Sequence, residues 1–131
     1  MSIPVSLRDL ESAAADRDAG AYVLTVDDLG APHVVRAEVL VADGGLIAAV
    51  GKRTALNAGR RSRVSLLYPA RDSEDYSLIV DAVATVIAEP DGARLLLAPT
   101  RAVLHRPAPA ADPAISPCGS DCVPLAIRAA R

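Results

Sequence analysis

Residues 22–68 read YVLTVDDLGAPHVVRAEVLVADGGLIAAVGKRTALNAGRRSRVSLLY and carry the strongest structural signal in the chain. Three apolar runs come first, followed by a short basic segment and a fourth apolar run. Gly30 and Pro32 mark the first turn, and Asp43-Gly44-Gly45 mark the second. The runs are rich in β-branched residues, namely Thr25, Val26, Val34, Val35, Val39, Val41, Ile47 and Val50. This pattern predicts three strands joined by hairpins, then a short helix and a fourth strand.

The rest of the chain predicts one more helix and two more strands. The six predicted strands cover 21–26, 33–42, 46–50, 63–68, 76–88 and 94–105. The two predicted helices cover 6–18, with Ser6 as N-cap, and 54–61. Asp91-Gly92 marks the turn between the last two strands. Six strands with two short helices predict a mainly β fold, a six-stranded antiparallel barrel.

The character of the chain changes after His105. The segment RPAPAADPAISP is rich in proline and has no packing periodicity, and CGSDCVPLAIRAAR follows it. We therefore expect one domain over residues 1–107 and an extended, proline-rich, cysteine-containing tail over residues 108–131.

The composition limits how the core is filled. The 131 residues include no Phe or Trp and only three Tyr, so Val, Leu, Ile and Ala must fill the core. Small side chains bury little area each, at about 25 cal/mol per Å². We therefore expect further burial in a subunit interface, and a homodimer as the form of the protein.

Charge and hydropathy exclude some partners. The formal net charge is −2 and the pI is near 5.6, which argues against nucleic-acid binding. No apolar run approaches the roughly 20 residues of a membrane span, and the N-terminus is polar and acidic, unlike a signal peptide. We expect a cytoplasmic protein with neither a nucleic-acid nor a membrane partner.

The first candidate site is the basic segment 51–63, which includes the basic side chains Lys52, Arg53, Arg60, Arg61 and Arg63. Thr54 is the predicted N-cap of the short helix, where free backbone N–H groups suit a phosphate. Arg36, on the second predicted strand, offers a forked contact to the same anion. The alternative is a solvated helix face with several exposed arginines.

The histidines and cysteines form no recognisable site. His33 and His105 lie at predicted strand ends, which favours structural or surface roles. Cys118 and Cys122 leave three possibilities open: incidental packing, a redox role, or half of a metal site shared across a dimer. No nucleophile elbow, P-loop, zinc-protease or dinucleotide motif occurs. The sequence therefore identifies no catalytic side chain and no metal ligands, and an enzyme of this kind would rely on a bound cofactor.

Four segments of the chain follow one another in a recognisable order. They are AYVLTVDDLGAPHVV at 21–35, VLVADGGLIAAVGKRTALNAGRRSRVSLL at 39–67, IVDAVATVI at 79–87 and LLLAPTRAVLHRP at 95–107. In order and spacing they resemble the pyridoxamine 5′-phosphate oxidase-like FMN-binding split-barrel family, which includes F420-dependent reductases. The resemblance covers residues 5–107 and implies a split barrel, with the cofactor held at a homodimer interface.

The resemblance also implies which residues hold the cofactor. The phosphate contacts would be Arg36, Lys52, Thr54 and Asn57, with Arg60 or Arg61 as further contacts. The flavin ring would lie against Val34–Val35 and Ser65–Leu66.

The chain departs from the family pattern at two places. Thr54 stands where a basic residue is common, and Lys52 stands where a hydroxyl residue is common. Asp81 replaces a glycine of the fifth strand, which places a carboxylate on a packed strand without an evident partner.

Two functions are compatible with these residues. The first is a homodimeric FMN- or F420-dependent oxidoreductase that transfers hydride between the cofactor and a small organic acceptor. The anionic tail of F420 suits the arginines of segment 51–63. The alternative is a non-enzymatic module that binds a flavin or tetrapyrrole, or a degenerate barrel that binds neither.

Overall fold

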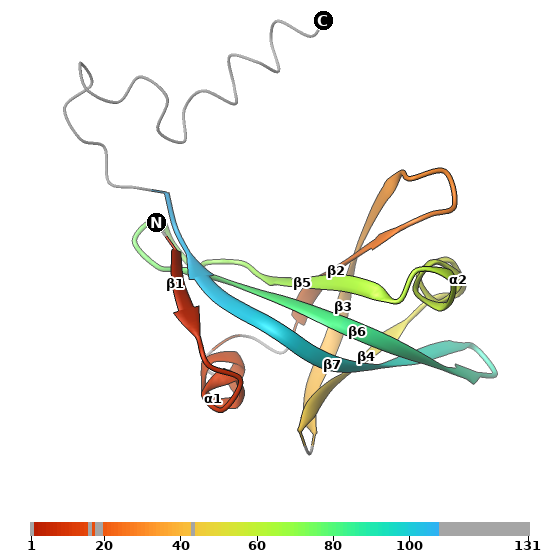
Figure 1. The fold of residues 1–131 in the computed structure, drawn as a ribbon, viewed down its shortest axis with the longest axis horizontal. Helices are drawn as coiled ribbons and strands as arrows, with labels where there is room; N and C mark the ends of the chain where they lie inside the picture. Colours follow the sequence, from red (N-terminus) through yellow and green to blue (C-terminus); the bar gives the residue numbers. More distant parts are fainter. Residues whose placement is uncertain (1, 16, 18–19, 43, 108–131) are drawn as a thin grey trace, which may run out of the picture.

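The computed structural model describes residues 2–15, 17, 20–42 and 44–107. These residues form seven strands and two helices (Figure 1). In chain order the elements are β1 (Ser2–Val5), α1 (Leu10–Ala15), β2 (Gly20–Val26), β3 (Pro32–Ala42), β4 (Gly45–Val50), α2 (Lys52–Arg60), β5 (Arg63–Tyr68), β6 (Ser77–Glu89) and β7 (Gly92–His105).

Six of these strands close into an antiparallel barrel. Their order around the barrel is β7-β4-β3-β2-β5-β6, and β6 pairs with β7 to complete it. A β-bulge between Asp81 and Ala82 interrupts the long β6–β7 pair, and such a bulge bends a strand locally. The predicted fold class, a six-stranded antiparallel split barrel with two short helices, is confirmed, and one further strand joins it.

The six predicted strands are confirmed with small shifts at their ends, and the differences lie in the N-terminal segment. β1 was not predicted, because four residues that include Pro4 give too short a pattern; it pairs with the last residues of β7. The first helix begins at Leu10 and not at Ser6, so its predicted start is wrong. Residues 6–9 form a turn in which the Asp9 backbone N–H donates to the Ser6 carbonyl at 3.0 Å. The predicted tail lies outside the described residues.

Alternating side chains fill the barrel with small aliphatic groups, as the composition predicts. Leu66, Leu78, Leu95, Val23 and Val80 are the largest aliphatic side chains that are almost fully buried. Residues between them in the sequence face outward, because successive side chains of a strand point to opposite faces. The outer wall of the barrel is therefore available for contacts outside the core.

The two helices lie at different ends of the barrel (Figure 1). α2 packs against β2, β6 and β7, whereas α1 packs against β3. Neither helix is long and apolar enough to span a membrane, and the structure describes no other helix. The first candidate site, segment 51–63, therefore lies at the end of the barrel that α2 covers.

Candidate functional site

The N-terminus of α2 is open. Gly51 is the N-cap residue, and no side chain caps the helix. The prediction of Thr54 as N-cap is wrong, because the helix begins at Lys52 and Thr54 lies inside it with only 2% of its surface exposed. Nothing lies within 4 Å of the point that a Cβ of Gly51 would occupy. The first backbone N–H groups of a helix lack intrahelical partners, so this end can receive an anion.

A groove of about 330 Å³ separates α2 from the turn that joins β2 to β3. Its helix side presents Lys52, Arg53, Asn57 and Arg60, and its opposite side is formed by residues 27–29. The structure therefore brings together three of the predicted phosphate contacts, Lys52, Asn57 and Arg60.

The basic side chains at this groove differ in how they are held. Arg60 forms an ion pair with the carboxylate of Asp28, and Arg61 Nη2 donates to the Asp28 carbonyl at 3.4 Å. Lys52 and Arg53 make no hydrogen bond or ion pair within the described part of the chain. Lys52 and Arg53 thus keep their donors for a ligand, whereas Arg60 and Arg61 fasten the helix to the turn.

Asp27 holds the other side of the groove in shape. Its Oδ1 accepts hydrogen bonds from the backbone N–H groups of Leu29 and Ala31, each at 2.9 Å. The bond from Ala31 is the main cause that lowers the pKa of Asp27. The carboxylate is therefore ionised at neutral pH and organises the turn that faces Lys52, a role the sequence did not reveal.

Asn57 connects α2 to the barrel interior. Its Nδ2 donates to Thr25 Oγ1 at 3.1 Å, and both side chains are buried. A polar pair in an aliphatic core stays favourable because the two groups satisfy each other. Asn57 therefore has a structural contact as well as a place in the groove.

A second groove, of about 510 Å³, crosses the outer face of β2, β5 and β6. Strand register places Leu24 opposite Ser65, and Ser65 opposite Asp81. Ser65 Oγ donates to Asp81 Oδ1 at 2.8 Å, and Arg101 Nη1 lies 3.5 Å from Asp81 Oδ2. The carboxylate that had no evident partner in the sequence thus faces outward and has two. Leu24, Ser65, Asp81 and Arg101 become neighbours only through the pairing of the strands. For this reason Leu24 and Arg101 were not predicted from the sequence.

The residues predicted to contact the flavin ring divide between the two faces of the barrel wall. Val34 faces outward, is 53% exposed and lies opposite Leu24. Ser65 lines the outer groove. Val35 packs against the core, and Leu66 is 0% exposed, so neither side chain is available to a ring bound on the outer surface.

Arg36 lies away from the other predicted phosphate contacts. It is on β3 opposite Tyr22, and it lines a cavity with Arg17 and residues 68–71. The structure therefore does not group Arg36 with Lys52.

The remaining candidates are dispersed. His33 is half-buried, and its Nδ1 has no hydrogen-bond partner within the described residues. His105 is exposed and its Nδ1 lies 3.1 Å from Ser2 Oγ. Cys118 and Cys122 lie outside the described residues. Within residues 2–107, the described side chains include no group of three potential metal ligands.

The chain has close sequence relatives in mycobacteria. It is 38% identical over 140 residues to an uncharacterized protein of Mycobacterium bovis, an alignment that covers 94% of this chain and 96% of the relative. The same values hold for an uncharacterized protein of Mycobacterium tuberculosis. No family model matches the chain.

Several solved structures share the fold at low sequence identity. A putative pyridoxamine 5′-phosphate oxidase from Listeria innocua has a TM-score of 0.64 and 14% identity, over 76% of this chain and 98% of that protein. The haem storage protein HutZ of Vibrio cholerae has a TM-score of 0.60 and 17% identity, over 76% and 94%. An F420 reductase has a TM-score of 0.57 and 16% identity, over 70% and 94%. These similarities establish the fold.

Proposed function

Since the chain belongs to one family with the two mycobacterial proteins and has the split-barrel fold of the pyridoxamine 5′-phosphate oxidase-like proteins, we propose that it is a homodimeric FMN- or F420-dependent oxidoreductase. Its reaction would move hydride between the cofactor and a small organic acceptor. The cofactor, when bound, supplies this redox chemistry, and the protein supplies binding, orientation and exclusion of water.

The open N-terminus of α2 beside Lys52 is the observation that carries this proposal. Anions bind at helix N-termini because backbone N–H groups and the helix dipole point at them. The uncapped first turn and the Lys52 ammonium, which has no described partner, together fit a phosphate group. Asn57 and Arg53 border the same groove and would complete the contacts. In the family pattern the basic residue is common at the position of Thr54. Here it is Lys52, two residues earlier, so its ammonium lies at the first residue of α2.

The outer groove supports a position for the ring. Val34 and Leu24 offer apolar contact, and Ser65 and Asp81 offer a hydroxyl and a carboxylate beside them. A planar ring with polar edges needs both kinds of contact. Both grooves border the hairpin between β2 and β3, so one elongated ligand would reach from one groove to the other.

The outer wall also supports the homodimer. Large apolar side chains are exposed on it, among them Val34, Leu40, Val83, Ile87 and Leu96. A second copy of the chain would cover such residues and would close the outer groove from above.

The proposal is tested by titrating the purified protein with FMN, FAD and F420 while following fluorescence. We expect saturable, stoichiometric binding of FMN or F420, and we expect size-exclusion chromatography with light scattering to give the mass of a dimer. A haem titration, followed by absorbance, is the comparison. Tight haem binding with no response to any flavin or F420 would assign the barrel to tetrapyrrole binding and overturn the oxidoreductase proposal.

A further inference from the structure

A separate cavity lies at the ends of β2 and β5 that are remote from α2. It holds about 130 Å³, and its wall is formed by Arg17, Gly20, Arg36 and residues 68–71. Among the described residues, the charged side chains that line it are Arg17, Arg36 and Arg71. These three residues are far apart in the sequence, so only the fold brings them together.

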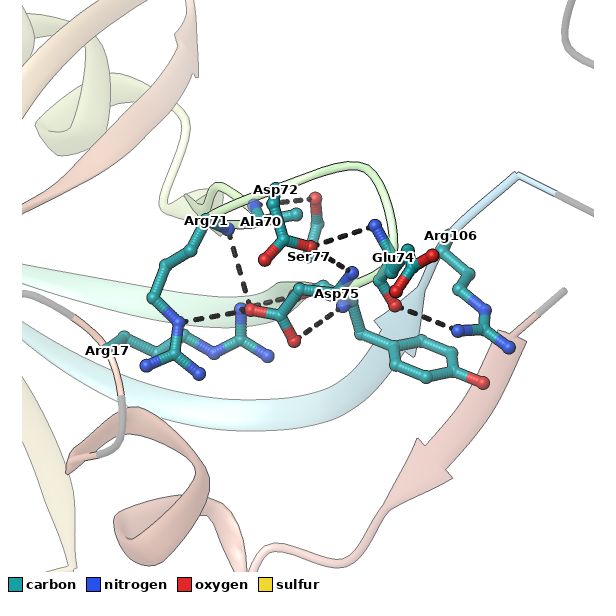
Figure 2. Close-up of polar contacts among 9 residues, drawn as sticks. Arg17, Ala70, Arg71, Asp72, Glu74, Asp75, Ser77 and Arg106 are labelled. Carbon is teal, nitrogen blue, oxygen red and sulfur yellow. Dashed lines mark hydrogen bonds and ion pairs between the residues drawn. The ribbon is translucent and has the colours of Figure 1, made fainter.

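Two of the arginines are held by one carboxylate, that of Asp75. Arg17 has only 9% of its side chain exposed, donates to the Tyr76 carbonyl and lies 4.0 Å from Asp75 Oδ2. Arg71 Nε donates to the same Asp75 oxygen at 3.2 Å. Figure 2 shows both guanidinium groups converging on Asp75. Asp75 is not among the residues that line the cavity, although its carboxylate contacts both guanidinium groups.

Arg36 completes the wall from β3. Its guanidinium lies directly over Gly20, because a Cβ on Gly20 would come within 2.5 Å of Arg36 Nη2. Within the described residues Arg36 makes no hydrogen bond or ion pair. Glycine at position 20 therefore provides the space in which the side chain of Arg36 reaches the cavity.

We infer that this cavity binds the phosphate group of a small molecule. A guanidinium has five N–H donors arranged as a fork that matches phosphate oxygens, and the contacts to Tyr76 and Asp75 use few of them. The volume corresponds to about four water molecules, which is room enough for one oxyanion. Asp75 pairs with Arg17 and Arg71, whereas Arg36 has no partner among the described residues, so an anion bound here would balance the positive charge that remains. The site is independent of the groove at Lys52, which has a different lining.

The test is a titration of the ¹⁵N-labelled full chain with inorganic phosphate, at ionic strength held constant with chloride. We expect saturable shifts of amide resonances that include those of Gly20, Ala70 and Arg71. Arg36→Gln should weaken the affinity about tenfold, as expected for one lost charge-assisted contact. Gly20→Ala should weaken it in the same direction, because the added methyl group displaces the Arg36 guanidinium. Arg94→Gln is the matched control, since Arg94 is exposed and pairs with Glu89 on the β6–β7 hairpin.

The outcomes separate the alternatives. Shifts that do not saturate, or that are the same in Arg36→Gln as in the unaltered protein, would overturn the inference. Tighter binding of acetate than of phosphate would also overturn it, because the cavity would then select a carboxylate. Tighter binding of a phosphate monoester supports an organic phosphate as the ligand, and tighter binding of inorganic phosphate supports the free ion.

Discussion

The two ends of the barrel hold positive charge in opposite ways. At the α2 end five basic residues lie close together in the sequence, yet Arg60 and Arg61 are bound to the turn after β2. At the other end three arginines come from distant segments and line one cavity. Asp75 pairs with Arg17 and Arg71 there, and Arg36 has no partner among the described residues. A dense basic segment therefore overstates the charge offered to a ligand, and a sparse set can understate it. What matters is which guanidinium groups the fold has already paired.

The largest effect should come from the contact that fastens α2 to the barrel. Asn57→Ala leaves the buried Thr25 hydroxyl without its partner, so the free energy of unfolding should fall by about 1–3 kcal/mol. Urea unfolding followed by circular dichroism measures this loss. Leu56→Ala is the control on the same helix, because Leu56 is 53% exposed, and it should change stability by less than about 0.5 kcal/mol. Equal losses in the two variants would mean that the Asn57 contact adds nothing.

A smaller effect, on the affinity for the cofactor, should distinguish the unpaired Lys52 from the paired Arg60. Lys52→Ala should weaken binding of the preferred cofactor about tenfold, since the ammonium is not engaged by any described residue. Arg60→Ala should weaken it less than about threefold, because Arg60 is held by Asp28 in an exposed ion pair. Fluorescence titrations of both variants give the ratio. A larger loss in Arg60→Ala would show that the phosphate lies at the C-terminal end of the helix.

The sequence predicted the barrel well because its signals are local. Turn residues such as Gly30, with a positive φ of 83°, and alternating apolar residues fix each strand without reference to its neighbours. The site was predicted only in part, because its composition depends on strand register. Ser65 and Asp81 meet because β5 and β6 pair with a particular offset. Leu66 and Val35 were assigned to the ring although the alternation of their strands points them inward.

The smallest effect should be on how stability depends on pH, through Asp75 at the end of the barrel that carries Arg17 and Arg71. The backbone N–H of Tyr76, and then Arg71, lower the pKa of Asp75 below its usual 3.8. A carboxylate with a lowered pKa in the folded state stabilises the protein at pH values above the unfolded pKa. This contribution disappears as the pH falls through the folded pKa. Asp75→Asn keeps an oxygen for Tyr76 but loses the charge that holds Arg17 and Arg71.

The unaltered protein should therefore be more stable than Asp75→Asn at neutral pH, and the difference should shrink as the solution is acidified below about pH 4. Urea unfolding at a series of pH values measures it, with Asp91→Asn in the exposed β6–β7 turn as the control. A difference that stays constant with pH would mean that packing, and not charge, accounts for the role of Asp75. In that case the orientation of Arg17 would rest on its bond to the Tyr76 carbonyl. The phosphate affinity of Asp75→Asn then distinguishes a role of charge from a role of packing. If the Asp75 charge orients Arg17 and Arg71, the affinity for phosphate should change in this variant; if only packing matters, it should not.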